Sequence, residues 1–254
     1  MTIRSWLKLT VPLTLICLPG NLYAQNVFRI EVKPIETVTL KTQQVLTGDP
    51  DGKPAVIAGE LRIPKPGTDK LPAVILVHGS GGVSAATDHW AQEINSLGVA
   101  AFILDSFSGR GISSTVNDQS QLDSLAMLVD AYRALGSLAQ HPRIDANRIG
   151  IMGFSKGAVA AVYSSNQRLQ KLYAPEGMRF AIHVGFCTLC NTAYRDDDKT
   201  TRAPIRLFQG IAIFNFVVLL RQAVQRQAAC PGGTICTWPC HSWSRPPSWA
   251  ASAP

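Results

Sequence analysis

Residues 148–162 read RIGIMGFSKGAVAAV, an apolar run followed by a Gly-x-Ser-x-Gly motif and an alanine-rich segment. This order predicts a strand, a sharp turn and a helix. In that setting Gly153, Ser155 and Gly157 form a nucleophile elbow, which exposes the serine hydroxyl on a strained turn. The glycines are needed because a Cβ at either position would collide with the neighbouring strand or the departing helix. The motif also arises by chance in roughly one chain of this length in ten or more, and its flanking elements favour the functional interpretation.

Strands and helical segments alternate on both sides of this motif. Residues 71–77 and 99–104 are continuous apolar runs, as expected for strands buried on both faces of a parallel sheet. Residues 87–97 and 120–138 carry apolar side chains at helical spacing. Further strands are predicted at residues 28–40, 55–63, 180–186 and 205–208. The sequence therefore predicts an α/β fold with a mainly parallel sheet and helices on both faces, and such sheets bind ligands at the carboxyl ends of their strands.

The composition is that of a globular protein. With 254 residues, 46% of them hydrophobic, the chain can bury the core of one domain. The net charge is +7, but the basic residues are scattered and form no stripe interleaved with aromatic residues. Nucleic-acid binding is therefore not expected.

The N-terminal segment has the layout of a secretory signal peptide. Arg4 and Lys8 precede an apolar stretch at residues 9–18, and a small residue, Ala24, ends the segment. The apolar stretch is too short to span a bilayer, so no stable membrane anchor is expected. The interpretation is a signal peptide at residues 1–24 and an exported product, periplasmic or secreted. The alternative is an ordinary buried N-terminal helix.

Five cysteines would remain after cleavage. They are Cys187, Cys190, Cys230, Cys236 and Cys240. In an oxidising compartment disulfides are the first interpretation, with at least one thiol unpaired and the pairing undetermined. A four-thiolate zinc site is the alternative. It is disfavoured because the first pair ends an apolar strand and the second pair is irregularly spaced.

A serine nucleophile needs donors for the oxyanion that forms at the substrate carbonyl. One donor is predicted to be the backbone N–H of Lys156, directly after Ser155. The others are predicted in the glycine-rich loop 79–82, at Ser80 and Gly81, where small residues allow close approach. The alternative for this loop is a turn without a ligand, or a phosphate site, although it lacks the Gly-Lys-Ser/Thr ending of a P-loop.

The nucleophile also needs a base, and in this architecture the triad runs Ser, acid, His along the chain. By this order only His183 and His241 qualify. His183 lies inside an apolar strand and is interpreted as a core residue. His241 is therefore the candidate base, and the alternative for it is a solvent-exposed tail histidine.

The triad acid has no clear candidate. It should follow the strand at 205–208, yet residues 199–254 contain no Asp or Glu. Asn215 could orient an imidazole but could not stabilise its charged form, a loss of up to about four orders of magnitude in a serine protease. The acidic run Asp196, Asp197 and Asp198 could reach the histidine from one strand earlier, or it could be a solvated charge run.

The chain resembles the dienelactone hydrolase family of α/β-hydrolases, in particular exported members with a serine nucleophile. The resemblance covers roughly residues 28–245 and rests on four segments, at residues 76–82, 105–111, 141–157 and 204–210. It implies a hydrolase domain at residues 25–245, a small-molecule ester or lactone substrate and no cofactor. The composition of the last residues predicts a disordered tail at 246–254. His241 matches the position of the family's histidine, whereas Ile213 and Phe214 stand where the family usually has Asp.

The residues after Ala212 are also unusual in composition, with three of the five tryptophans and three of the six cysteines. A reading-frame error after Ala212 or a degraded gene is therefore an alternative. In that case the product would be a catalytically impaired or inactive α/β-hydrolase scaffold.

Export is the first testable prediction. Cleavage near Ala24 removes Arg4 and Lys8 and lowers the net charge from +7 to +5. We expect protein recovered from outside the cytoplasm to begin at or near Gln25, as measured by intact mass and N-terminal sequencing. Protein that keeps Met1 and stays in the cytoplasmic fraction would refute this prediction.

Overall fold

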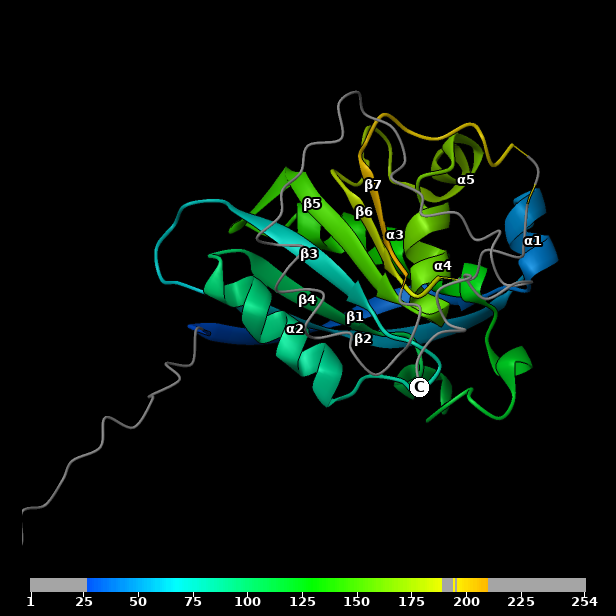
Figure 1. Ribbon diagram of the computed structural model, residues 1–254, viewed down its shortest axis with the longest axis horizontal. Coiled ribbons are helices and arrows are strands. Elements are labelled where there is room, and N and C mark those ends of the chain that lie inside the picture. The colour runs from blue at the N-terminus through cyan, green and yellow to red at the C-terminus, as the bar shows by residue number, and fades with distance from the viewer. Residues whose placement is uncertain (1–26, 189–193, 195, 210–254) are drawn as a thin grey trace, which may run out of the picture.

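The computed structural model describes residues 27–188, 194 and 196–209. Its elements are β1 (Arg29–Thr39), α1 (Thr42–Thr47), β2 (Lys53–Ile63), β3 (Leu71–Val77), α2 (Ala85–Ser96), β4 (Ala100–Asp105), η1 (Ser108–Arg110), η2 (Gln119–Gln121), α3 (Ser124–Ala139), β5 (Ile144–Phe154), α4 (Lys156–Tyr163), α5 (Gln167–Tyr173), β6 (His183–Phe186) and β7 (Ile205–Phe208). The strands form one sheet of order β1-β2-β4-β3-β5-β6-β7 (Figure 1).

The sheet is mostly parallel. Strands β4, β3, β5, β6 and β7 run in the same direction, whereas β2 is antiparallel to both β1 and β4. Parallel neighbours need long crossovers, which α2, α3 and the α4–α5 pair supply. Strand β5 lies between β3 and β6, so the residue that follows it sits in the middle of the carboxyl edge. This arrangement confirms the predicted α/β-hydrolase fold.

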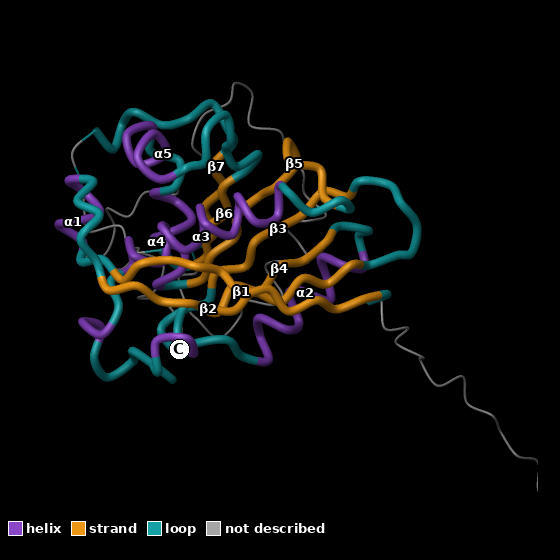
Figure 2. The backbone as a smooth tube through the Cα atoms, turned by 180° about the vertical axis from the view of Figure 1, so that it is seen from behind, coloured by secondary structure: helices purple, strands orange, loops and turns teal. Residues whose placement is uncertain are grey.

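Helices cover both faces of the sheet. Phe102 and Leu104 of β4 belong to the large core cluster with α3 and α4, while Ala101 and Ile103 pack with α2 on the opposite face. Figures 1 and 2 show α2 and α3 on opposite sides of the strands. Because successive residues of a strand point to opposite faces, strands covered on both sides must be apolar throughout. This is why the buried runs of β3 and β4 were readable from the sequence.

Some element boundaries differ from those predicted. The helix predicted at 120–138 begins only at Ser124, because Asp123 has extended backbone and its carboxylate accepts the N–H of Thr42 at 2.6 Å. A strand was predicted at 180–186, but the observed strand β6 contains only the last four of these residues. Helices α1 and α5 were not predicted, since each is under eight residues long and has only one buried residue.

Several predictions fall outside the described residues. They concern the signal peptide at 1–24, the tail at 246–254, and the end of the hydrolase domain at 210–245. None of the helices in the described part of the chain has the length and apolarity needed to cross a membrane.

Gly157 is the glycine whose replacement we expect to damage the fold most clearly. A Cβ there would lie 2.3 Å from the carbonyl oxygen of Val77 and 2.4 Å from that of His78, and neither backbone can easily move. We expect Gly157→Ala to lower the free energy of unfolding by about 3 kcal/mol. Gly81→Ala is the matched control, because a Cβ at Gly81 meets nothing within 4 Å. Equal urea midpoints for the two variants would contradict this packing argument.

Candidate active site

Ser155 occupies the turn between β5 and α4. Its backbone has φ 50° and ψ −111°, a positive φ that few residues other than glycine adopt. The residue is exposed, and its N–H donates to the carbonyl of Phe186 at 2.8 Å, which ties the turn to β6. A Cβ at Gly153 would lie 2.1 Å from the carbonyl oxygen of Gly157, so only glycine fits this reversal. The turn therefore has the geometry of a nucleophile elbow.

Helix α4 begins directly after Ser155. The N–H groups of its first turn, at Lys156 and Gly157, have no acceptor within the helix. The positive end of the helix dipole also lies here. A negative charge that develops beside Ser155 would thus meet the backbone N–H of Lys156.

The glycine-rich loop after β3 lies against the elbow. A Cβ at Gly79 would be 3.2 Å from the carbonyl oxygen of Phe154 and 3.5 Å from Cβ of Ser155. The structure therefore brings the predicted oxyanion loop and the predicted nucleophile together, although they are 76 residues apart along the chain. The absence of a side chain at Gly79 permits this approach.

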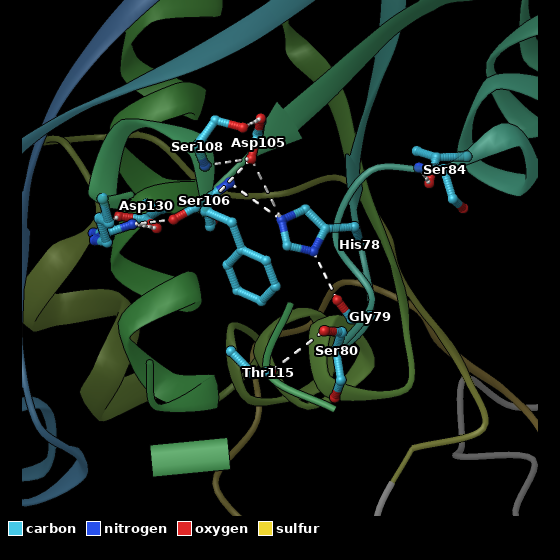
Figure 3. A network of polar contacts seen from close by, with 12 residues as sticks. His78, Gly79, Ser80, Ser84, Asp105, Ser106, Ser108, Thr115 and Asp130 are labelled. Atoms are coloured by element: carbon cyan, nitrogen blue, oxygen red, sulfur yellow. Dashed lines mark hydrogen bonds and ion pairs between the residues drawn. The ribbon is translucent and has the colours of Figure 1, made fainter. Parts of the chain in front are cut away.

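Two hydrogen bonds fix the direction of the carbonyl of Gly79 and thereby the direction of the N–H of Ser80. The carbonyl accepts a hydrogen bond from Nδ1 of His78 at 2.8 Å (Figure 3). It also accepts the N–H of Gly82 at 3.1 Å. In a trans peptide the C=O and the next N–H point in opposite directions. The N–H of Ser80 is consequently turned away from these two donors.

The same reasoning applies to the next peptide. The carbonyl of Ser80 accepts the N–H of Thr115 at 2.8 Å, so the N–H of Gly81 points away from Thr115 (Figure 3). Among hydrogen bonds between described backbone groups, neither Ser80 nor Gly81 donates its N–H. Both groups are therefore free of backbone partners within the described chain and can serve as donors.

The imidazole of His78 stabilises the glycine-rich loop 79–82. Its side chain is buried, and Nε2 accepts the N–H of Ser106 at 3.2 Å, which leaves the proton on Nδ1 for the carbonyl of Gly79 (Figure 3). Burial lowers the pKa of His78, so the ring is neutral at pH 7. The edge of the ring packs against Phe107, with centroids 4.3 Å apart.

The segment 105–111 positions the loop after β4. Burial alone would raise the pKa of Asp105, but hydrogen bonds from the hydroxyl and N–H of Ser108 and from the N–H of Phe107 outweigh it and lower the pKa (Figure 3). The oxygens of this carboxylate accept donors from their own loop. Asp105 therefore shapes its own loop.

Arg110 and Asp130 form an ion pair in the interior. Two N–H groups of the guanidinium donate to the carboxylate, both at 2.8 Å, and the side chains are only 4% and 0% exposed. Thr37 donates to Asp130 at 2.7 Å, and Arg110 Nε donates to Thr39 at 2.8 Å. The pair connects η1, α3 and β1, which accounts for the arginine in the 105–111 segment that the sequence left without a role.

The structure places His183 in the core, as predicted. The residue is 1% exposed, and Nδ1 lies 2.9 Å from Oγ of Ser164 and 3.1 Å from the carbonyl of Ala161. Burial lowers the pKa of His183 to about 4. His183 is therefore a neutral structural residue between β6 and α4.

The acidic run at 196–198 is only partly a solvated charge run. Asp198 is exposed, and Asp196 pairs with Lys199 at 2.8 Å. Asp197 turns inward instead, and accepts the N–H of Tyr194 at 2.6 Å and the hydroxyl of Tyr163 at 3.4 Å. Since Tyr163 is the last residue of α4, this contact lies about 12 Å along the helix from Ser155. It does not place Asp197 at the elbow.

His241 and residues 213–215 lie outside the described residues. So do Cys190, Cys230, Cys236 and Cys240, while Cys187 carries a free thiol. Over residues 27–188, 194 and 196–209, no group of three His, Cys, Asp or Glu side chains could hold a metal ion. The structure thus brings together Ser155, Lys156, Ser80 and Gly81 of the predicted site.

Comparison with known proteins identifies the domain. The model of the dienelactone hydrolase family matches residues 57–175. Residues 57–175 are a dienelactone hydrolase family domain. The match runs from within β2 to just past α5, so it contains the glycine-rich loop and the elbow.

Individual relatives of this dienelactone hydrolase domain are distant. A Bradyrhizobium protein named as a probable 2-oxo-3-(5-oxofuran-2-ylidene)propanoate lactonase is 27% identical over 158 residues, which span 60% of this chain and 58% of that protein. A solved dienelactone hydrolase-like promiscuous phosphotriesterase from metagenomic libraries is 14% identical, with 77% of each chain covered and a TM-score of 0.49. A hyperthermophilic esterase from Pyrobaculum calidifontis is 21% identical, with 65% of this chain and 45% of that chain covered and a TM-score of 0.44.

The burial of His183 predicts a loss of stability in acid. In the unfolded chain this histidine titrates near 6.5, but in the folded protein near 4, so the unfolded state binds more protons between these values. Its contribution is complete above about pH 6.5 and is lost as the pH falls toward 4, a change of about 3 kcal/mol. In the wild type, the free energy of unfolding measured with urea should therefore fall with a clear slope as the pH is lowered from 7 to 4.5.

The slope should flatten in His183→Gln. It should persist in His89→Gln, which alters a side chain that is 61% exposed. Equal slopes in His183→Gln and the wild type would contradict the assignment.

Proposed function

We propose that this protein hydrolyses carboxylic esters or lactones through an acyl-enzyme on Ser155. The observation that carries the proposal is the combination of strain and exposure at Ser155, next to the glycine-rich loop. A serine held at positive φ at the carboxyl edge of the sheet costs stability, and such strained conformations are typical of functional sites. The named activity of the Bradyrhizobium lactonase relative and the match to the dienelactone hydrolase family support the same reaction class.

In the proposed reaction, Oγ of Ser155 attacks the acyl carbonyl carbon while a base takes the hydroxyl proton. The base is proposed to be His241, which then protonates the leaving alcohol oxygen. Water activated by the same histidine attacks the acyl-enzyme, releases the acid and restores the serine. For a lactone, the alcohol and the acid remain parts of one molecule.

The oxyanion formed in each step is proposed to lie between two chain segments. The N–H of Lys156 approaches it from the start of α4, and the N–H groups of Ser80 and Gly81 approach it from the loop after β3. A single donor of this kind contributes about 10²- to 10³-fold to kcat. Because these donors are backbone groups of a packed turn and a pinned loop, they need little reorganisation as charge develops.

Aromatic side chains supply an apolar surface beside the nucleophile. Phe154 stacks on Phe186 with centroids 5.3 Å apart, and Phe186 stacks on Phe208 at 4.7 Å. Trp90 of α2 packs against Phe186 at 5.2 Å. This row follows the carboxyl ends of β5, β6 and β7. Phe186, in the middle of the row, is buried, so we propose that the partly exposed Phe154 and Phe208 contact the uncharged part of a small ester or lactone.

The alternative is an impaired or inactive hydrolase scaffold. The observation that favours it is the absence of Asp and Glu from residues 199–254. Without a carboxylate the imidazolium formed during attack lacks its stabilising partner, and kcat could fall by about 10⁴. The oxyanion donors and Ser155 would still react with a strongly activated acylating reagent.

Covalent labelling separates these two functions. We expect a fluorophosphonate probe to modify Ser155 of the folded protein, and p-nitrophenyl acetate to give a burst equal to the enzyme concentration. Ser155→Ala should abolish both, whereas Ser96→Ala, which alters an exposed serine at the end of α2, should change neither. Mass spectrometry of the labelled peptide is the measurement. Folded wild-type protein that takes up no label would refute the serine mechanism.

His241 is tested in the same assay. If it is the base, His241→Ala should slow labelling by about 10³-fold or more. Labelling at the wild-type rate would remove His241 from the site and leave the role of Ser155 intact.

A further inference from the structure

Gln119 connects the two sides of the proposed oxyanion hole. It lies in η2, and its side-chain oxygen accepts hydrogen bonds from Nζ of Lys156 at 3.0 Å and from Oγ of Ser80 at 3.1 Å. The hydroxyl of Thr115 lies 3.5 Å from the same oxygen. Because the Lys156 ammonium can only donate, the amide oxygen and not the amide nitrogen must face it, and the two hydroxyls donate to the same oxygen.

The side chain of Lys156 depends on this residue. Lys156 is 5% exposed, and burial lowers its pKa. Nζ donates to the backbone carbonyl of Gln119 at 3.0 Å as well as to its side-chain oxygen. Asp118 and Asp123 favour the charged amine from a distance, but no described carboxylate lies within 4.0 Å of Nζ. Gln119 therefore supplies the close acceptors that a buried ammonium requires.

The two tethered residues belong to separate segments. Lys156 begins α4, and Ser80 lies in the loop after β3, so no helix or strand hydrogen bond sets the distance between them. Each carries one of the backbone donors proposed for the oxyanion. The side chain of Gln119 therefore bridges the two segments, in addition to the backbone contacts at Gly79 and Gly157.

We propose that Gln119 is a positioning residue that sets the width of the oxyanion hole through Lys156 and Ser80. This inference rests on the proposed function. Oxyanion donors must lie about 2.7–3.1 Å from the oxygen in the transition state. A shift of about 1 Å in one segment costs up to 10²-fold in rate. Loss of the tether should therefore lower kcat and leave substrate binding nearly unchanged.

The test compares Gln119→Ala with Gln121→Ala in the full-length protein. Gln121 is the matched control, because it is an exposed glutamine of the same turn. Among the described residues, its amide donates only to the backbone carbonyls of Ser114 and Asp118. With p-nitrophenyl acetate, we expect Gln119→Ala to lower kcat by about 10- to 100-fold with KM within threefold. Gln121→Ala should match the wild type.

Two further measurements distinguish positioning from a general loss of structure. Gln119→Glu keeps oxygens that can accept from Lys156 and Ser80, so kcat should stay within about threefold of the wild type. The inhibition constant of phenylboronic acid, which mimics the tetrahedral intermediate, should rise in Gln119→Ala by the same factor as kcat falls. The Tm should fall only slightly, since the backbone carbonyl of residue 119, which still accepts from Nζ of Lys156, is kept in Gln119→Ala.

The outcomes are separable from those of the proposed function. Wild-type protein that is labelled at Ser155 while Gln119→Ala keeps its kcat within twofold would overturn this inference alone. An equal loss of kcat in Gln119→Glu, or a loss without weaker boronate binding, would also overturn it. Wild-type protein without labelling at Ser155 would overturn the proposed function and this inference with it.

Discussion

The close approach of the β5–α4 turn to the end of β3 is the constraint on which the site depends. Gly157 packs directly against the carbonyls of Val77 and His78, where even a methyl group has no room. Because this contact is made where β3 ends, the chain that leaves β3 must pass beside Ser155. Nucleophile and glycine-rich loop are therefore brought together by backbone packing, before any side chain of the site is considered.

Buried polar side chains hold the irregular segments around that contact. Loops have no ladder of backbone hydrogen bonds, so their buried polar groups need other partners. The imidazole of His78 holds the loop after β3 in place through a hydrogen bond, and the Arg110–Asp130 ion pair holds the loop after β4 in place. A buried ion pair contributes little net stability because desolvation offsets the attraction. Its effect here is to select one loop arrangement, since breaking it would leave a charge uncompensated in the core.

Much of the fold was predictable because both faces of the sheet are covered. Buried strands such as β3 and β4 are apolar throughout, and the steric demands of the elbow leave glycine at 153 and 157. Helices α1 and α5 carry too little buried surface to leave an apolar pattern, so they were missed. The inward position of Asp197 was not predictable, because a run of three carboxylates resembles a solvated surface and nothing local indicates that one of them contacts Tyr163.

The sequence by itself determined the fold class, the candidate nucleophile and the segments from which oxyanion donors could come, because each depends on local spacing and residue type. Only the tertiary structure decided that the loop of Ser80 lies against Ser155, that Asp105 serves its own loop, and that Gln119 binds both Lys156 and Ser80. Apart from the contacts of Asp105 within its own loop, these relations join residues 37 to 76 positions apart through irregular chain. No periodic pattern in the sequence predicts such contacts, since they follow from the order in which the strands pair in the sheet.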